Sequence, residues 1–323
     1  MLFRNSLRLL LENFKNVYKI LLYKFVVGLV AGALCCAMVL PELIELWNSA
    51  PMQELIDGVN GFFKAFFAAD AEGLQAVKDQ LFGEEGTLHN VVKLVLSKTT
   101  GIVLATVGCV VVYLFKRFAD TLCYFAVGGV LNDKMSTYTE TPLSTSYLTN
   151  IGKGCRYALV YVPIAFAFDV LAVGLCYVLI RYVNILPALF LSMTTIVLLQ
   201  SLKLTFTGRW MPAMTADQKR LRDSVKYEDK TERKQRLKIF STNLTCVYGV
   251  IIVNVMAAIA TIGSALIITV PASYFLFICV QYAYYYTIKG KKYFITYERI
   301  ASNPDRGDRE HFFNYIDATQ EEK

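Results

Sequence analysis

The sequence predicts an all-α, polytopic integral membrane protein: a six-transmembrane-helix bundle with an amphipathic N-terminal interfacial helix and an outer helical hairpin. Residues 239–288 are 50 consecutive residues without Asp, Glu, Lys, Arg or His. Hydrophobic residues make up 55% of the 323-residue chain and charged residues only 18%, where about 25% charged residues is typical of soluble domains. The mean hydropathy is +0.42, and the apolar residues occur in long blocks, which also indicates a membrane protein.

The long uncharged run is too long for one membrane crossing. As a single helix it would measure about 75 Å at 1.5 Å per residue, against a hydrocarbon core of roughly 30 Å. We therefore predict two spans, residues 241–263 and 270–289. The turn is expected between Gly263 and Pro271, because Gly263-Ser264 favours a helix break and proline suits a first helical turn.

Further apolar runs complete the six predicted spans, and each is close to the roughly 20 residues that a bilayer requires. They are residues 25–41, 99–117, 157–180 and 182–206. Residues 118–131 are apolar again but too short to cross a membrane. We expect them to extend the helix of the second span or to form a re-entrant segment, within a cytoplasmic or interfacial segment that comprises residues 118–156.

The distribution of basic residues predicts the orientation. Residues 1–24 contain five lysines and arginines, and the connector at 207–238 is rich in both. Residues 42–98 contain nine acids and only four lysines. Because lysine and arginine are enriched in cytoplasmic loops, both termini, the connector and the tail at 290–323 are predicted to be cytoplasmic, in a cell membrane. A cleaved signal peptide is the competing interpretation of the first run, but a 24-residue basic region is atypical of one.

The segments outside the spans are predicted to be mostly helical. Residues 1–24 place apolar residues on one stripe and basic residues elsewhere, which is typical of an interfacial helix that anchors the first span. Tyrosines and lysines at the end of the last span predict an aromatic belt and a basic anchor. They are Tyr282, Tyr284, Tyr285, Tyr286, Tyr293, Tyr297, Lys289, Lys291 and Lys292. Thr215 and Gln218 form a predicted capping box that opens a charged helix, either a solvated connector or a docking helix.

Two helices are predicted within the extracytoplasmic segment 42–98. Pro51 favours the start of the first, Asp70 is a candidate N-cap of the second, and Gly83 favours its end. The first helix carries a stripe of phenylalanines, which we call the phenylalanine face: Phe62, Phe63, Phe66 and Phe67. This face is predicted to pack on the bilayer or the bundle, or to be a docking face for an extracellular protein.

One carboxylate lies in the middle of a predicted span. Asp169 at that depth costs at least about 2.5 kcal/mol unless it is paired, protonated or hydrated. The residues at a similar predicted depth in other spans are Asn254, Gln281, Thr194 and Thr195. Hydrated, this group would form a binding site or a proton relay; dry, it would form interhelical hydrogen bonds.

Sequence motifs of catalysis are missing from the chain. It has no HExxH, no glycine-rich phosphate loop and no GxSxG, and its eight cysteines form no CxxC pair. We therefore predict no catalytic residues, no cofactor and no metal site. Nucleic acid is not an expected partner, because the basic residues flank apolar spans rather than forming one solvated face. The expected partners are the lipid bilayer and, as open alternatives, other proteins or a second copy of the chain.

These features predict a non-enzymatic transport component, either a small permease or the membrane subunit of a larger transporter. The alternative is a structural or regulatory scaffold that binds partners through its outer helices and its charged connector. A lipid-modifying enzyme is a third hypothesis, for which the sequence names no catalytic residue.

Overall fold

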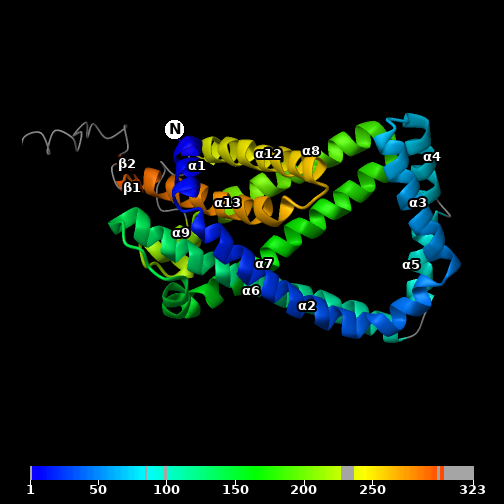
Figure 1. Cartoon of the computed structure of the whole chain (residues 1–323), viewed down its shortest axis with the longest axis horizontal. Helices are drawn as coiled ribbons and strands as arrows, with labels where there is room; N and C mark the ends of the chain where they lie inside the picture. Colours follow the sequence, from blue (N-terminus) through cyan, green and yellow to red (C-terminus); the bar gives the residue numbers. More distant parts are fainter. Residues whose placement is uncertain (1, 84–85, 98–99, 227–235, 297–298, 302–323) are drawn as a thin grey trace, which may run out of the picture. The chain divides into compact units, whose positions relative to one another are not determined.

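The computed structural model describes residues 2–83, 86–97, 100–226, 236–296 and 299–301 (Figure 1). In these ranges the regular elements are helices apart from one small antiparallel sheet, as the fold class predicts. The chain divides into two compact units, and each is described by itself. The first unit comprises Met1–Lys24, Asp120–Tyr161 and Ser201–Lys323, and the second comprises Phe25–Ala119 and Val162–Gln200.

The elements follow one another in a simple order. The helices are α1 (Leu2–Glu12), α2 (Lys15–Trp47), α3 (Ala50–Phe67), α4 (Ala71–Phe82), α5 (Thr87–Ser97), α6 (Thr100–Thr137), α7 (Leu143–Tyr182), α8 (Ile185–Thr207), α9 (Trp210–Ala216), α10 (Leu221–Val225), α12 (Arg236–Thr261) and α13 (Leu266–Ile288). Strands β1 (Tyr293–Thr296) and β2 (Arg299–Ala301) pair antiparallel.

Among the described residues, five helical stretches are long and apolar enough to cross a membrane. They are Lys15–Leu40, Leu143–Tyr182, Ile185–Ala216, Arg236–Thr261 and Leu266–Ile288. Most of their apolar surface is not covered by other parts of the protein, as expected where lipid replaces a protein neighbour. The predicted second span lies in the first part of α6 and is not among the five, and Lys116, Arg117 and Asp120 closely follow its apolar residues.

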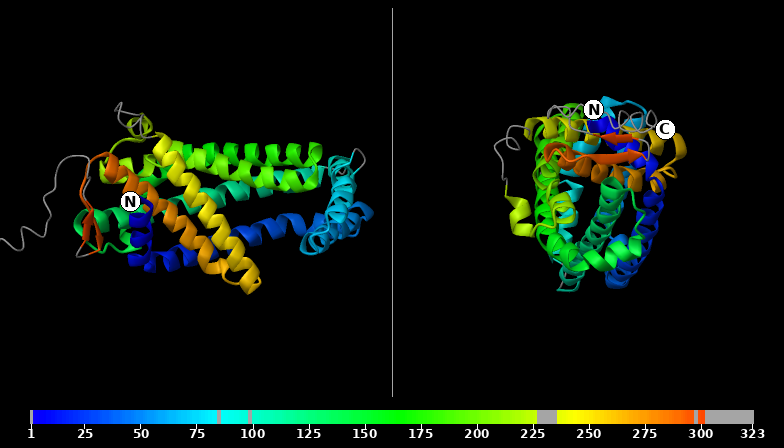
Figure 2. Two further views of the ribbon diagram at one scale, coloured as in Figure 1. Left: turned by 90° about the horizontal axis from the view of Figure 1, so that it is seen from above. Right: turned by 90° about the vertical axis from the view of Figure 1, so that its left-hand side faces the viewer.

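The predicted turn between the last two spans is present. Helix α12 ends at Thr261 and α13 begins at Leu266. Ile262 and Gly263 both have positive φ, 51° and 85°, and the Gly263 amide donates to the Ala258 carbonyl at 2.8 Å. This six-to-one bond is the C-terminal cap that left-handed residues permit. Pro271 lies inside α13 rather than in its first turn. Figure 2 shows α12 and α13 side by side after this turn.

The helix break near the N-terminus falls earlier than the predicted boundary at residue 24. Helix α1 ends at Glu12, and α2 runs from Lys15 into the first apolar run without interruption. Asn13 favours this break, because its side-chain amide donates to the Leu9 carbonyl at 2.9 Å. Leu9 and Leu10 of α1 are buried, and α1 packs on α13 and β1, whereas Phe3 and Leu11 stay exposed.

Helix α6 resolves the two alternatives for residues 118–131. They continue the helix without interruption to Thr137, so they extend the second predicted span rather than turning back. The first unit packs around this extension, with Phe125, Leu131 and Tyr282 fully or almost fully buried. Close approach requires glycine at position 128, because a Cβ there would lie 2.6 Å from the Tyr282 hydroxyl. Loop residues 138–142 then lead into α7.

Within residues 42–98, both predicted caps of the second helix are present. Asp70 is the N-cap of α4, and its Oδ1 accepts from the Gly73 amide at 3.0 Å. Gly83 caps the C-terminus of α4. Helices α3, α4 and α5 pack on one another within the second unit. Lys78 of α4 donates to the Val183 carbonyl at 3.0 Å, at the turn between α7 and α8.

Candidate functional site

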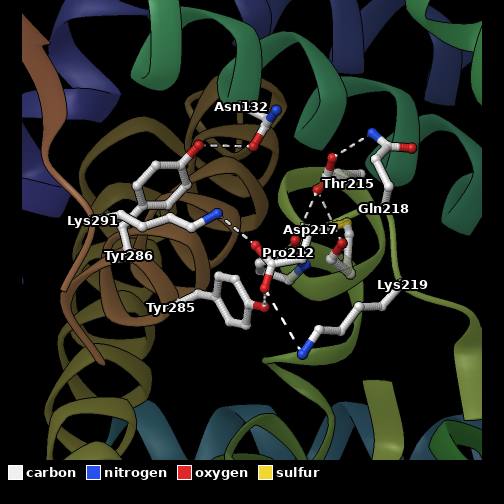
Figure 3. Close-up of polar contacts among 10 residues, drawn as sticks. Asn132, Pro212, Thr215, Asp217, Gln218, Lys219, Tyr285, Tyr286 and Lys291 are labelled. Carbon is white, nitrogen blue, oxygen red and sulfur yellow. Dashed lines mark hydrogen bonds and ion pairs between the residues drawn. The ribbon is translucent and has the colours of Figure 1, made fainter. Parts of the chain in front are cut away.

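A connected polar cluster of the first unit surrounds Asp217, directly after the short helix α9 (Figure 3). Met211 and Met214 bury α9 against its surroundings, and this burial brings the carboxylate next to the end of α13. The Tyr285 hydroxyl donates to Asp217 Oδ2 at 2.5 Å, and Lys291 Nζ donates to Oδ1 at 2.5 Å. Lys219 Nζ is an additional cation 3.9 Å from Oδ2.

The charge state of Asp217 follows from this environment. Burial raises the pKa of the carboxyl, but hydrogen bonds from Lys291 and Tyr285 and the charges of Lys291 and Lys219 outweigh it. The net effect is a pKa below the ordinary value for aspartate. Asp217 is therefore an anion at neutral pH, and it connects α9, α13 and the segment that leads into β1.

Hydroxyl groups extend the cluster on both sides. Thr215 Oγ1 lies 2.7 Å from the Tyr282 hydroxyl and 3.0 Å from the Met211 carbonyl. The Gln218 side chain donates to the Thr215 carbonyl at 2.8 Å, and the Tyr286 hydroxyl donates to Asn132 Oδ1 at 2.9 Å. The tyrosines at positions 282, 285 and 286 thus face protein, where the sequence predicted an aromatic belt.

A separate polar cluster lies in the second unit, around Asp169 of α7. Arg117 of α6 forms an ion pair with its Oδ2, and Gln200 of α8 donates to Oδ1 at 3.1 Å. Arg117 also donates to the Tyr113 hydroxyl at 2.9 Å. The side chains of Arg117 and Asp169 are 19% and 28% exposed. The ion pair is therefore partly shielded from its surroundings by neighbouring protein atoms.

The other residues of the predicted intramembrane site lie as follows. Thr194 donates to the Phe190 carbonyl of its own helix at 2.9 Å, and Thr195 is half-buried in the same unit as Asp169. Asn254 and Gln281 belong to the first unit. Asn254 Nδ2 donates to Ser273 Oγ at 3.0 Å, and its Oδ1 accepts from Thr269 at 2.7 Å, which joins α12 to α13. Gln281 is half-buried on α13.

Sequence reasoning missed Arg117, Gln200 and Asp217. Arg117 is the last residue of the second predicted span, and the long side chain of an arginine at such a boundary can extend along the helix. The signal for Asp217 was the spacing of Tyr282, Tyr285 and Tyr286, which places three hydroxyls on one face of a helix. A buried tyrosine hydroxyl usually has a hydrogen-bond partner, and Asp217 is the first acid after Asp169 in the sequence.

The phenylalanine face is exposed on α3. Phe63 and Phe66 are about half exposed, Phe67 is 77% exposed, and Phe62 is partly covered. Neighbouring rings lie 5.9 to 6.5 Å apart, so the four side chains form one continuous apolar ladder. This exposure requires an apolar environment or a partner.

Cysteine, histidine and carboxylate side chains are the usual metal ligands of proteins. The eight cysteines are free thiols. No group of three or more His, Cys, Asp or Glu side chains within the described ranges is arranged to hold a metal ion.

Comparison of the chain with known proteins gave no relative from which a function could be transferred. No family model matches the sequence. Searches of curated proteins and of solved structures found no match either. The functional assignment therefore rests on the residues and contacts described above.

Proposed function

We propose that this protein is a non-enzymatic transport component of a membrane, with Arg117, Asp169 and Gln200 as its polar site. It is a small permease or the membrane subunit of a larger transporter. The observation that carries this proposal is an ion pair between Asp169, which lies inside an apolar helical stretch, and Arg117 of α6. Ionisable residues in such segments are costly and usually belong to ion or substrate pathways.

Stability alone is a weak explanation for the pair. Replacing a shielded ion pair by apolar residues is often neutral or stabilising by about 1 to 4 kcal/mol. A helix bundle that needed only packing would therefore not require Arg117 and Asp169. The pair has two states that a transporter can use, because protonation of Asp169 removes its charge and releases the Arg117 guanidinium for another anion.

The proposed topology has six spans with both termini in the cytoplasm of the cell. The five apolar helical stretches and the first part of α6 supply the spans. The basic residues of 1–24 and 207–238 support the orientation, and the acid-rich segment 42–98 supports the opposite location for α3, α4 and α5.

The test is proton flux through the purified full-length protein in liposomes loaded with the pH-sensitive dye pyranine. A potassium gradient with valinomycin supplies the driving force. We expect flux in the wild type and its loss in Asp169→Asn, which keeps the size of the side chain. Thr245→Ala is the matched control, because its hydroxyl bonds to the carbonyl of Ser241 one turn back on the same helix and the residue lies outside the predicted polar site. The control should retain wild-type flux.

Chemical labelling provides a second readout of the same site. Dicyclohexylcarbodiimide is an apolar reagent that modifies protonated carboxyl groups, and mass spectrometry locates the product. We expect modification of Asp169 to increase in Arg117→Gln, because loss of the guanidinium favours the protonated carboxyl. Wild-type flux in Asp169→Asn would refute the site, and liposomes without any flux would favour a scaffold.

A membrane scaffold is the second candidate function, and the exposed phenylalanine face favours it. In this alternative α3 binds another protein through Phe63, Phe66 and Phe67. Replacing these three residues by serine should abolish co-purification of that protein from mildly solubilised membranes. The variant should still insert and should retain the thermal stability of the wild type.

A further inference from the structure

Helices α3 and α4 form an antiparallel pair within the second unit (Figure 1). A Cβ at Gly58 would lie 2.8 Å from Cδ2 of Leu81. Further along α3, a Cβ at Gly61 would lie 3.4 Å from Cγ2 of Val77, which precedes Leu81 by one turn of α4. The two helices therefore run in opposite directions, and small residues mark the side of α3 that packs on α4.

A different side of α4 rests on the turn between α7 and α8. The Lys78 ammonium donates to the carbonyl of Val183 at 3.0 Å. The side-chain oxygen of Gln75 accepts from the amide of Ile185 at 3.3 Å. At 3.6 residues per turn, this side of α4 lies roughly 110° around the helix from the side that packs on α3. Helix α3 is therefore beside α4 and not between α4 and the turn.

The right-handed twist of both helices then determines where the remaining sides of α3 point. For an antiparallel neighbour in this position, the phenylalanine face of α3 points outward from α4 and toward the α7–α8 turn. The polar side of α3 points the opposite way, beyond the ends of α7 and α8. Its residues are exposed: Gln53, Asp57, Asn60 and Lys64.

The helices around the α7–α8 turn carry exposed apolar and aromatic surface. Tyr177 and Tyr182 lie near the end of α7, and Leu186 near the start of α8, and all three are exposed. Trp47, also exposed, ends α2 shortly before α3 begins at Ala50. Because tyrosine and tryptophan are enriched where hydrocarbon gives way to lipid headgroups, these residues mark the membrane surface. The phenylalanine face is continuous with this lipid-facing surface.

The residues of α3 suit a lipid surface. Helices that lie in a membrane interface have one apolar side and one polar side, with the apolar side buried by roughly 5 to 10 Å. The charged residues of α3 are Glu54, Asp57 and Lys64, and none of them belongs to the phenylalanine face. Insertion of this face therefore takes no charge of α3 into hydrocarbon, where each charge would be costly.

We propose that α3 is an interfacial helix whose phenylalanine face inserts into the lipid leaflet at the α7–α8 turn. Its axis lies along the membrane surface, and its polar side faces water. Through α4, this lipid contact holds the outer ends of α7 and α8. The occupant of the face is lipid, whereas the scaffold alternative assigns it to a protein. The inference uses only the apolar helices and the α3–α4 geometry, so it does not rest on the transport function.

The test follows tryptophan emission of the purified full-length protein in phosphatidylcholine liposomes. The two native tryptophans, Trp47 and Trp210, are replaced by phenylalanine. Phosphatidylcholine brominated on its acyl chains quenches a tryptophan within hydrocarbon, and iodide on both sides of the membrane quenches one in water. We expect Phe66→Trp to lose most of its emission in brominated liposomes and little with iodide. Lys64→Trp is the matched control, because it is exposed on the polar side of the same helical turn. It should show the opposite pattern.

Three results would overturn the proposal. Quenching of Phe66→Trp by iodide but not by bromine would place the face in water. Resistance to both quenchers would show that protein covers it, as a second copy of the chain would. Equal bromine quenching of Phe66→Trp and Lys64→Trp would show that insertion is not one-sided. Since Trp210 is buried, its replacement can impair folding. In that case the same variants are made in the wild-type background, and the wild-type emission is subtracted.

Discussion

The Tyr285 hydroxyl donates to Asp217 Oδ2 over 2.5 Å, and this contact joins the last long helix to the short helix α9. Lys291 holds the other oxygen of the same carboxylate at 2.5 Å. One acidic residue thereby connects three segments of the first unit. Charge-assisted hydrogen bonds of this kind are stronger than neutral ones, so Asp217 is expected to contribute to stability in a pH-dependent way.

Asp217→Asn should lower the free energy of unfolding at pH 7 by about 1 to 3 kcal/mol. The pKa of Asp217 is lower in the folded protein than in the unfolded chain. Its contribution is therefore fully present above the unfolded pKa of about 3.9, and it is lost as pH falls through the folded pKa. Thermal unfolding from pH 7 to pH 2 should show the wild type and the variant converging at the acid end.

The control for that experiment is Asp223→Asn, because Asp223 is an exposed acid on α10 in the same unit. Its stability curve should follow the wild type throughout. A constant difference between wild type and Asp217→Asn at every pH would show that packing, rather than the charge, accounts for the effect.

Gly128→Ala should destabilise the first unit by about 1 to 3 kcal/mol through overpacking. The new Cβ would lie 2.6 Å from the Tyr282 hydroxyl and 3.0 Å from Met211 Sδ. Gly152→Ala is the matched control, because it is also helical and has open space around its Cβ position. Alanine there should be neutral or stabilising by up to about 1 kcal/mol. Thermal unfolding in detergent distinguishes the two, and equal melting temperatures for both variants would contradict the close packing.

Asp169→Leu and Arg117→Leu should each destabilise the protein, because each leaves an uncompensated charge in partly shielded surroundings. The double variant should be more stable than either single variant, since both charges are gone. A double-mutant cycle on thermal stability measures this coupling. Additive losses would show that the two side chains do not interact in the folded protein.

Single cysteines at Glu72 and Arg222 should react with a membrane-impermeant thiol reagent from opposite sides of the membrane. The proposed topology places residues 42–98 and 207–238 on different sides, and both side chains are exposed. The background must lack the eight native cysteines. Labelling of intact cells gives the result directly, and modification of both positions from outside would refute the orientation.

Short-range signals predicted the local structure well. Asp70 and Gly83 bound α4 because an N-cap acceptor and a C-terminal glycine act on backbone groups only a few residues away. The turn at Gly263 falls where predicted because 50 uncharged residues exceed the thickness of a bilayer. The sequence was less informative at Thr215, whose capping-box spacing suggested a helix start. There the hydroxyl is buried near the end of α9 and contacts Tyr282.

Membrane character follows from the sequence by itself, because runs of apolar residues need no tertiary partner to favour a bilayer. Only the tertiary structure decided that residues 118–131 continue α6, since an extension and a re-entrant segment have the same composition. It also decided that Arg117 and Gln200 contact Asp169, and that Asp217 contacts Tyr285 and Lys291. The physical reason is that side-chain pairs 31 to 74 residues apart depend on how helices pack, and hydrophobic patterning does not encode that packing.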